Sequence, residues 1–376
     1  MKKSDLAQVA VTAMLAVFLT GATARESNLI SLGPALSFPA EDEISVWWQS
    51  SADTKKHFVE YGMTPELGNT LAHAAATDTP FVTLSGLEPD RLYYYRVTSD
   101  NNQSAVRSFR TLKKKQDIDF LRVGIWADNQ HGKEIFRKFT IPALKRAAPD
   151  FLMAIGDEVQ NGDKPADWRE QLYIPAARLL DTLAWLPVRG NHDGESSLAR
   201  KMMPLKNNVQ WYSFSAGPLY IVVLDTNLDY SPGSAQYKWF IGQTRSEAWT
   251  SAAFRVVAFH HPPWTNLWDN ANYSGEKNVR AHLVPAIENA GTDVVLNGHA
   301  HCYEHAVRKT RTGITHYFIV GGGGGALDRV RTANWPDIVK EKSSYHIAVM
   351  DVSRSRLKLS ITDTVSGSLI DEIQIP

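Results

Sequence analysis

The sequence has almost no cysteine and no excess of charge of either sign. Its one cysteine, Cys302, excludes an internal disulfide and a zinc site built from cysteine pairs. The 40 lysine and arginine residues balance 40 aspartate and glutamate residues, so no long-range field would collect nucleic acid or anionic lipid. With 43% hydrophobic and 21% charged residues, the composition excludes disordered, collagen-like and coiled-coil proteins. A chain of 376 residues is therefore expected to form about two globular domains.

Long hydrophobic runs are also scarce, and the longest uncharged run lies at the N-terminus. Lys2 and Lys3 precede the run Leu6–Ala24, which ends in small residues. This pattern is typical of a cleavable secretory signal peptide over residues 1–24. The alternative, a membrane anchor, is disfavoured because the strongly apolar part, Val9–Leu19, is short for a bilayer of about 30 Å. We expect a periplasmic or secreted protein that does not contact the membrane after cleavage.

Residues 27–112 contain short segments with strand-like alternation, separated by turn residues such as Gly86 and Pro89. No helical period lies between them, which is typical of a small antiparallel β-sandwich. The stretch Val82–Pro89 followed by Tyr93–Val97 resembles a fibronectin type III module. The expected strands are Ile44–Gln49, His57–Tyr61, Phe81–Leu84, Arg91–Thr98 and Ala105–Thr111.

After a polar linker at 113–116, residues 117–376 alternate apolar strands with amphipathic helices. This alternation predicts an α/β domain whose strands are buried on both faces. In such sheets, functional groups gather beyond the carboxyl ends of the strands. The expected strands are Phe120–Trp126, Phe151–Ile155, Ala184–Val188, Tyr220–Leu224, Phe254–Phe259 and Val294–Leu296, and the expected helices are Lys133–Arg146, Ala166–Leu183 and Val279–Asn289.

Five polar clusters, or blocks, follow these strands: Asp128–Gln130, Gly156–Glu158, Gly190–Asp193, His260–Pro262 and Gly298–His301. Any one of them has an ordinary structural explanation, such as a helix cap, but His299 and His301, at i and i+2 behind a glycine, favour metal ligation. Together the clusters would bring six oxygen and nitrogen donors to one sheet edge, which is enough for two ions. Carboxylates and imidazoles without a thiolate suit zinc, manganese or iron. The six donors are Asp128, Asp157, Asn191, His260, His299 and His301.

The five blocks, in this order, resemble the calcineurin-like metallophosphoesterase superfamily, and the preceding sandwich makes the chain similar to the purple acid phosphatases within it. The resemblance implies a layered α/β/β/α catalytic domain and two divalent or trivalent ions of iron, zinc or manganese. It implies that Asp157 bridges the two ions. Asp128 and His301 would bind the first ion, and Asn191, His260 and His299 the second. His192 would be the catalytic residue that protonates the leaving oxygen or stabilises its charge.

Several positions depart from the family pattern. Gln160 stands where purple acid phosphatases have the tyrosine whose bond to ferric iron gives their colour. No purple colour is therefore expected, and the identity of the metal at the first site is left undetermined. Gln130 stands where other members of the superfamily have a histidine. Gln130 and Gln160 are therefore candidates for additional metal ligands, and His131 is an alternative to Gln130. Residues 264–277 lack the family's substrate-contacting histidine. Their aromatic side chains would either stack on a nucleoside or sugar or simply anchor the loop.

The glycine run Gly321–Gly325 lacks the lysine and hydroxyl residue of a phosphate-binding loop. We expect instead a turn where the backbone passes close to the site.

We therefore expect an exported dinuclear enzyme that hydrolyses phosphate monoesters by attack of metal-activated hydroxide, like an acid phosphatase. Its partner would be a small-molecule phosphate ester, with no nucleic acid expected. One alternative is a phosphodiesterase acting on nucleotides or phospholipid head groups. The other is a surface-binding protein with a vestigial metal site. The sequence favours no oligomeric state.

Overall fold

The structure, a computed structural model, describes residues 30–51, 54–206, 209–270 and 272–376. The predicted signal peptide, residues 1–24, lies outside the described residues. The described strands form three sheets of nine, seven and five strands. Within the described ranges, no helix has both the length and the apolar character needed to cross a bilayer.

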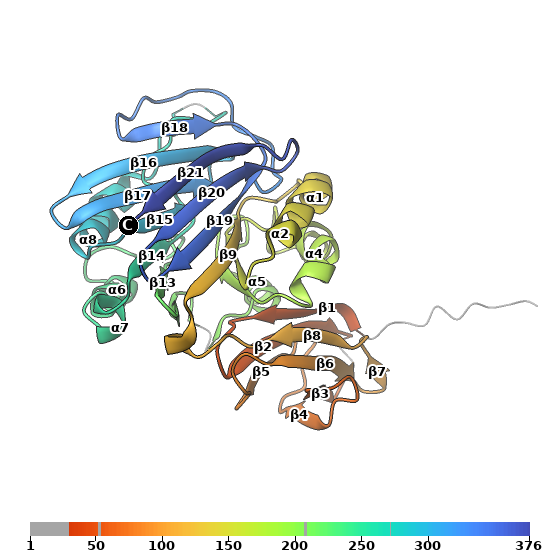
Figure 1. Ribbon diagram of the computed structural model, residues 1–376. Helices are drawn as coiled ribbons and strands as arrows, with labels where there is room; N and C mark the ends of the chain where they lie inside the picture. The colour runs from red at the N-terminus through yellow and green to blue at the C-terminus, as the bar shows by residue number, and fades with distance from the viewer. Residues whose placement is uncertain (1–29, 52–53, 207–208, 271) are drawn as a thin grey trace, which may run out of the picture.

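The N-terminal part is built from two facing sets of strands, as expected for a sandwich (Figure 1). One set runs in the order β1-β2-β5, and the other in the order β4-β3-β6-β7, with β8 paired to β6. Trp48, Val59 and Tyr95 are fully buried between them. All five expected strands are present. The strands are β1 Ile30–Ser37, β2 Glu43–Ser50, β3 His57–Gly62, β4 Asn69–His73, β5 Phe81–Ser85, β6 Leu92–Ser99, β7 Asn102–Gln103 and β8 Arg107–Arg110.

The second part has two sheets packed face to face with helices outside them. Parallel strands β9-β10-β11 lie at the centre of one sheet, and parallel β13-β14-β15-β17 at the centre of the other. Strands β10, β13 and β15 are buried along their whole length, as predicted for strands covered on both faces. The central strands are β9 Phe120–Trp126, β10 Phe151–Ile155, β11 Trp185–Val188, β13 Leu219–Val223, β14 Phe254–Ala258, β15 Val294–Asn297 and β17 Gly313–Val320.

Antiparallel strands extend both sheets. Strands β19, β20 and β21 continue the first sheet from β9, while β12 and the pair β16 and β18 lie at the two ends of the second. The strands expected from the sequence did not include β12 or the strands from β16 onward. Their bounds are β12 Tyr212–Ala216, β16 Tyr303–Thr310, β18 Ile338–Lys342, β19 His346–Ser353, β20 Leu357–Asp363 and β21 Leu369–Ile375.

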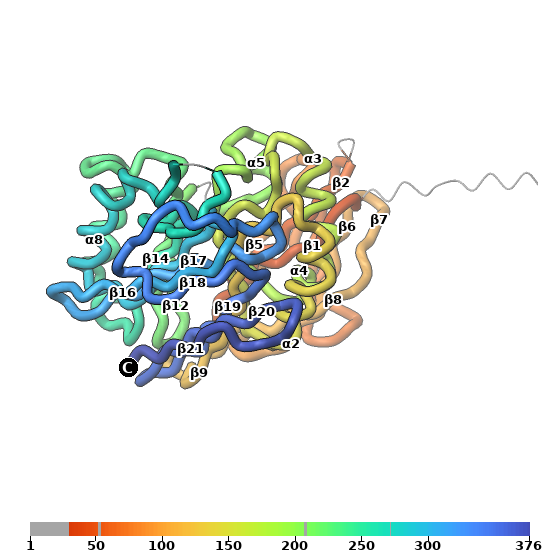
Figure 2. The backbone as a smooth tube through the Cα atoms, turned by 90° about the horizontal axis from the view of Figure 1, so that it is seen from above, coloured from red at the N-terminus to blue at the C-terminus, as the bar shows by residue number. Residues whose placement is uncertain are grey.

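Helices cover the outer face of each sheet, which gives the expected α/β/β/α layers. Figures 1 and 2 place α2 and α4 on one side of the strands and α8 on the other. Leu144 and Leu179 pack with the outward side chains of the first sheet, and Phe240 and Ile287 with those of the second. The helical segments are η1 Lys115–Asp117, α1 Lys133–Ile135, η2 Phe136–Thr140, α2 Ile141–Ala147, α3 Pro165–Asp167, η3 Trp168–Tyr173, α4 Ile174–Leu180, α5 Ser197–Met202, α6 Ala235–Gln243, α7 Glu247–Thr250, η5 Val279–Leu283 and α8 Val284–Asn289.

The three predicted helices share one irregularity. Each contains a π-helical turn (η2, η3 and η5) directly before an α-helix with proline in its first turn: Pro142, Pro175 and Pro285. Proline has no N–H group, and its ring would collide with the carbonyl of the preceding turn. A widened turn accommodates the ring without ending the helix. Each helical run is therefore continuous through its proline, although the second ends at Leu180, three residues before its predicted end.

The two parts share a sheet, which the sequence did not predict. Strand β1 pairs with β2 on one side and, in parallel, with β11 on the other through Ser37 and Trp185. The Tyr95 hydroxyl donates to the Asp181 carbonyl at 2.9 Å, and Arg107 pairs with the Asp181 carboxylate at 2.6 Å. The N-terminal strands are therefore fixed against the second part.

Candidate metal centre

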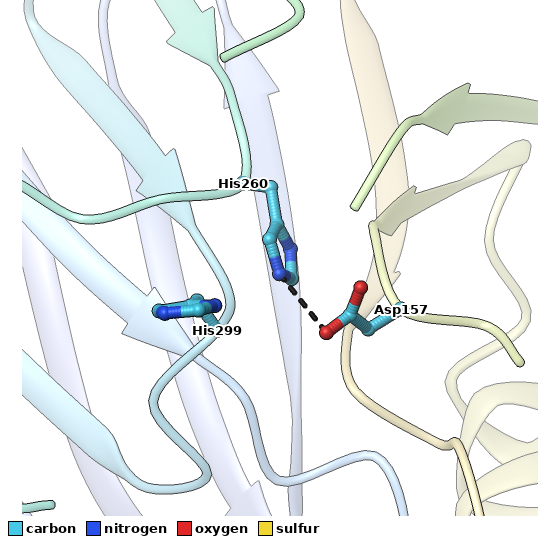
Figure 3. Close-up of side chains that lie close together, drawn as sticks. All are labelled: Asp157, His260 and His299. Atoms are coloured by element: carbon cyan, nitrogen blue, oxygen red, sulfur yellow. Dashed lines mark ion pairs between the residues drawn. The ribbon is translucent and has the colours of Figure 1, made fainter. Parts of the chain in front are cut away.

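Three ligand-type side chains meet where strands of both sheets end. Asp157 follows β10, His260 follows β14 and His299 follows β15. Figure 3 shows His260 and His299 approaching from one sheet and Asp157 from the other. One ligand atom from each lies within 4.8 Å of the others. The carboxyl ends of the strands thus bring together residues that are far apart in the sequence.

Asp128 and His301 lie beside this group. The His260 Nε2 atom is 3.2 Å from Asp157 Oδ2 and 4.0 Å from Asp128 Oδ1. The His301 Nε2 atom is 3.6 Å from the same oxygen of Asp128. Two carboxylates and two imidazoles therefore surround one small volume.

Asn191 completes the set on the His299 side. Its Oδ1 atom is 2.9 Å from His299 Nδ1. All six side chains that the sequence singled out as donors are thus linked by short contacts.

The backbone is strained where the two aspartates turn out of their strands. Asp128 has φ 60° and Asp157 φ 57°, in the left-handed region that side chains rarely adopt. Such residues cost of order 1–3 kcal/mol each. Hydrogen bonds offset the cost, because Asp128 accepts the His299 N–H at 2.9 Å and Asp157 Oδ1 accepts the His192 N–H at 2.8 Å. The strained turns hold both carboxylates toward the histidines.

Glycines give the loops the space to approach one another. Gly156 has φ 89°, and a Cβ atom there would overlap the His260 ring. The expected approach of the glycine run is confirmed, since a Cβ atom at Gly325 would lie 2.7 Å from His301 Cε1.

The electrostatics of the group are those of carboxylates and imidazoles removed from water. Burial raises the pKa of Asp128 well above its usual range, and the nearby Asp157 adds to the rise. Burial by itself would lower the pKa of His260, but Asp157 and Asp128 outweigh it and raise that pKa to about 10. Burial and the neighbouring His260 lower the pKa of His299. A positive charge is therefore favoured between the two aspartates.

The residues present fit divalent metal ions. The His260 Nε2 and Gln130 Oε1 atoms are buried and have no hydrogen-bond partner among the described residues. An ion between the carboxylates would give the Gln130 Oε1 lone pair a partner and would supply the positive charge that the two aspartates favour there. His260 would then be neutral, with the lone pair of Nε2 turned to the ion. The donors are all oxygen and nitrogen, the types that suit zinc, manganese and iron.

The two glutamines lie in different places. Gln130 is buried, with its Nε2 atom 3.2 Å from Asp157 Oδ2 and 3.0 Å from His301 Nε2. Gln160 instead contacts His192: its Nε2 atom is 3.1 Å and its backbone oxygen 2.9 Å from His192 Nδ1. The side chain of His131 is exposed.

Sequence reasoning missed two residues that hold this site together. Gln171 Oε1 accepts the backbone N–H groups of His131 and Gln160, each at 2.9 Å. The Asp193 carboxylate accepts three or more backbone N–H groups from the loops that carry Asp157 and Asn191. Asp193 closes the Gly190–Asp193 block, so its position was a signal that went unused.

A pocket of about 320 Å³ opens above the group, lined by His192, His299 and His301 among others. The aromatic loop is anchored by a buried tryptophan, as one of the two expectations had it, while stacking on a nucleoside or sugar stays a prediction. Trp264 is buried against Tyr317, whereas Trp268 lines the pocket and stacks on His299 with ring centroids 5.0 Å apart. Among the described residues, none from the N-terminal sandwich lines this pocket.

Comparison with known families agrees with this architecture. Residues 121–303 match the family described as calcineurin-like phosphoesterase, and residues 32–111 match the purple acid phosphatase N-terminal domain. The chain belongs to the calcineurin-like metallophosphoesterase superfamily. Its two-domain order and its relatives make it similar to the purple acid phosphatases, a family that implies a dinuclear metal centre. The narrower resemblance of the sandwich to fibronectin type III stays a prediction.

The relatives are distant. Purple acid phosphatase 15 of Arabidopsis thaliana is 25% identical over 285 residues, which cover 65% of this chain but only 53% of that protein. Purple acid phosphatase 22 of the same plant is 25% identical over 378 residues, covering 90% of this chain and 83% of that protein. The chain thus spans about half the length of the first relative and most of the second.

Two solved structures share the fold. A purple acid phosphatase from yellow lupin seeds superimposes with a TM-score of 0.78 at 18% identity, covering 91% of this chain and 73% of that one. The structure of PhoD gives a TM-score of 0.69 at 14% identity, covering 93% of this chain and 89% of that one.

Proposed function

We propose that this chain is an exported, dinuclear metal-dependent phosphoesterase that hydrolyses phosphate monoesters. The observation that carries the proposal is the convergence of two carboxylates, one amide and three imidazoles at one edge of the paired sheets. Buried carboxylates and imidazoles with unpaired atoms are costly unless a cation or a substrate satisfies them. The family match supports phosphoester hydrolysis as the function of this cluster.

Asp157 is the residue proposed to be shared by both ions. Its Oδ2 atom faces His260, and its Oδ1 atom is fixed by the His192 N–H. Asp128 and His301 lie together and would hold the first ion. Asn191 and His299 lie together and would hold the second ion with His260. When bound, two such ions supply a hydroxide nucleophile at ambient pH and neutralise phosphate oxygens.

Gln130 is proposed as a further ligand of the first ion. Its amide lies between Asp157 and His301, and one amide atom is buried without a partner. Gln160 is not proposed as a ligand, because its contacts are with His192. With neither glutamine carrying charge, the first site favours a divalent ion more than a ferric one.

His192 is proposed as the general acid. The backbone oxygen of Gln160 accepts a hydrogen bond from His192 Nδ1, which fixes the ring and leaves Nε2 as the nitrogen that can protonate a leaving group. As the oxygen of the attacking water bonds to phosphorus, the ester P–O bond breaks. The departing alkoxide then takes its proton from His192.

The proposal includes the targeting and domain organisation. Residues 1–24 would be removed on export to the periplasm or beyond the cell, leaving a sandwich over residues 27–112 and a catalytic domain over residues 117–376. The sandwich is proposed to support the catalytic domain, since β1 and Asp181 join the two.

The test is metal analysis of the purified protein together with phosphate release from a matched panel of monoesters and diesters. We expect about two ions per chain and faster hydrolysis of the monoesters. Faster turnover of the diesters would favour the phosphodiesterase alternative. Metal-loaded protein that releases no phosphate from either class would contradict an enzymatic role and favour a vestigial site.

A further inference from the structure

The pocket above the candidate metal centre is acidic and aromatic beyond its metal-ligating residues. Trp268, Asp269 and Asp328 line one side of it. None of the described residues that line the pocket is a lysine or an arginine. A pocket built to bind a second phosphate or carboxylate on the substrate would need such a cation.

Asp269 is the charged group that this side of the pocket offers to a substrate. Its Oδ1 atom accepts the backbone N–H groups of Arg329 at 2.5 Å and Val330 at 2.9 Å, while Oδ2 has no hydrogen-bond partner among the described residues. The same two N–H groups lower the pKa of Asp269, so its carboxylate stays ionised. Asp269 is exposed, and its free oxygen can reach a ligand.

Asp328 fixes the position of Asp269 relative to the metal-ligating residues. Its Oδ1 atom accepts the Asp269 N–H at 2.8 Å, and its Oδ2 atom accepts the His301 N–H at 2.7 Å. One buried carboxylate thus connects the two segments. Asp269 is therefore held at a set place beside His301.

Trp268 supplies an aromatic surface in the same pocket as that carboxylate. Its ring stacks on His299 at an interplanar angle of 25° and contacts Tyr273 at 4.5 Å between centroids. It is only partly buried and lines the pocket. An aromatic ring beside a carboxylate favours an ammonium group, through cation–π attraction and charge pairing.

We propose that the preferred substrates are phosphate monoesters whose leaving alcohol carries an ammonium group, such as phosphocholine or phosphoethanolamine. This inference rests on the phosphomonoesterase function proposed above. Trp268 and Asp269 bind the ammonium group while the phosphate lies at the metal centre. Esters with a second anionic group are poor substrates, because Asp269 repels that group and no lysine or arginine among the described lining residues neutralises it.

Arg329 is the basic residue whose charge acts on the Asp269 carboxylate. Its guanidinium contributes to the lowered pKa of Asp269 from a distance. Within the described residues it makes no ion pair with Asp269 and does not line the pocket. It therefore leaves the carboxylate available.

The test compares two esters of the same shape on the metal-loaded full chain. Phosphocholine and 3,3-dimethylbutyl phosphate differ only in a quaternary nitrogen that is replaced by carbon. We expect kcat/KM to favour phosphocholine by roughly tenfold, mainly through KM. Propane-1,3-diol bisphosphate should be the poorest of the three substrates. Equal kcat/KM for the first two esters would overturn the proposal.

Asp269→Asn separates charge from shape, since asparagine keeps an oxygen that can accept the Arg329 and Val330 N–H groups. The ratio of kcat/KM for the two esters should fall toward one in this variant. Asp119→Asn removes the same charge from a side chain that is 92% exposed outside the pocket, and should keep the wild-type ratio. An unchanged ratio in Asp269→Asn would also overturn the proposal.

A failure of the catalytic proposal would be recognised separately. If no ester is turned over, including 4-nitrophenyl phosphate, the proposed function is wrong. Calorimetric binding of phosphocholine and its carbon analogue to the metal-loaded chain then tests the selectivity alone. Tighter binding of phosphocholine that is lost in Asp269→Asn supports the ammonium site, and equal binding of the two compounds refutes it.

Discussion

The carboxylate of Asp193 accepts the backbone N–H of Asp157 at 2.9 Å. The same carboxylate accepts the Glu158 N–H at 2.9 Å and the Gly190 N–H at 2.8 Å. It is fully buried. A side chain that is not itself a proposed ligand thus holds together the loops that present Asp157 and Asn191.

We predict that Asp193→Ala loses both stability and metal. The substitution leaves several buried N–H groups without an acceptor, at about 1–3 kcal/mol each before relaxation. The two loops should then separate, so that metal content falls well below that of the wild type. Chemical denaturation and metal analysis measure the two effects. Asp193→Asn, which keeps one acceptor oxygen, should lie between the two proteins, and full metal content in Asp193→Ala would contradict this role.

Asp157→Asn tests the proposed bridge directly. Replacing a shared carboxylate with a neutral amide removes charge from both proposed sites, so we expect less than about one ion per chain and a loss of phosphate release of at least about a hundredfold. Elemental analysis after gel filtration gives the metal content. The matched control is Asp119→Asn, which should bind metal like the wild type. Full metal occupancy in Asp157→Asn would show that this carboxylate is not shared.

The strands and the meeting of the six candidate donors at one sheet edge could be predicted because their signals are local. Buried runs such as Phe151–Ile155 are continuous and apolar, and the polar residue that follows each one marks the sheet edge. The pairing of β1 with β11 could not be predicted, since a single contact between Ser37 and Trp185 leaves no pattern in either segment. The role of Asp193 was harder to infer, although its place at the end of the Gly190–Asp193 block was a usable signal. Its partners are backbone N–H groups, which carry no residue identity.

The place of Gln160 shows what family position alone can miss. A ligand position in relatives suggested a metal contact, but the side chain turns toward His192 instead. Only the three-dimensional contacts show where the Gln160 side chain lies.

Replacing His192 should slow chemistry without removing metal. A general acid matters most when the leaving alkoxide is basic, so His192→Asn should reduce kcat roughly a hundredfold or more for alkyl phosphates but far less for 4-nitrophenyl phosphate. Metal content should match the wild type, because the proposed donors are untouched. Steady-state kinetics across a series of leaving groups measures the difference. An equal loss for every leaving group would exclude proton donation by this residue.

His346 should make the fold less stable in acid. The ring is fully buried, its Nδ1 atom donates to the Ser344 carbonyl at 2.8 Å, and its Nε2 atom has no partner among the described residues. Burial lowers the pKa of His346 to about 4, although the Ser344 carbonyl and Asp363 act in the opposite direction. A proton on Nε2 would be a buried charge without an acceptor, so the folded protein keeps the ring neutral.

The direction of this pH effect follows from when the folded and unfolded states each bind the proton. The unfolded chain binds the His346 proton near its ordinary pKa of 6.5, before the folded protein does. The contribution of neutral His346 to the free energy of unfolding is therefore complete above about pH 6.5. This contribution, on the order of 3 kcal/mol, is lost as the pH falls toward about 4. His346→Asn keeps a donor for Ser344 but does not titrate, so its stability should fall less steeply. Chemical denaturation of the wild type and His346→Asn, both with metal removed by a chelator, measures the unfolding free energy between about pH 4 and about pH 7.5. Two parallel curves of unfolding free energy against pH would show that the proton binds elsewhere.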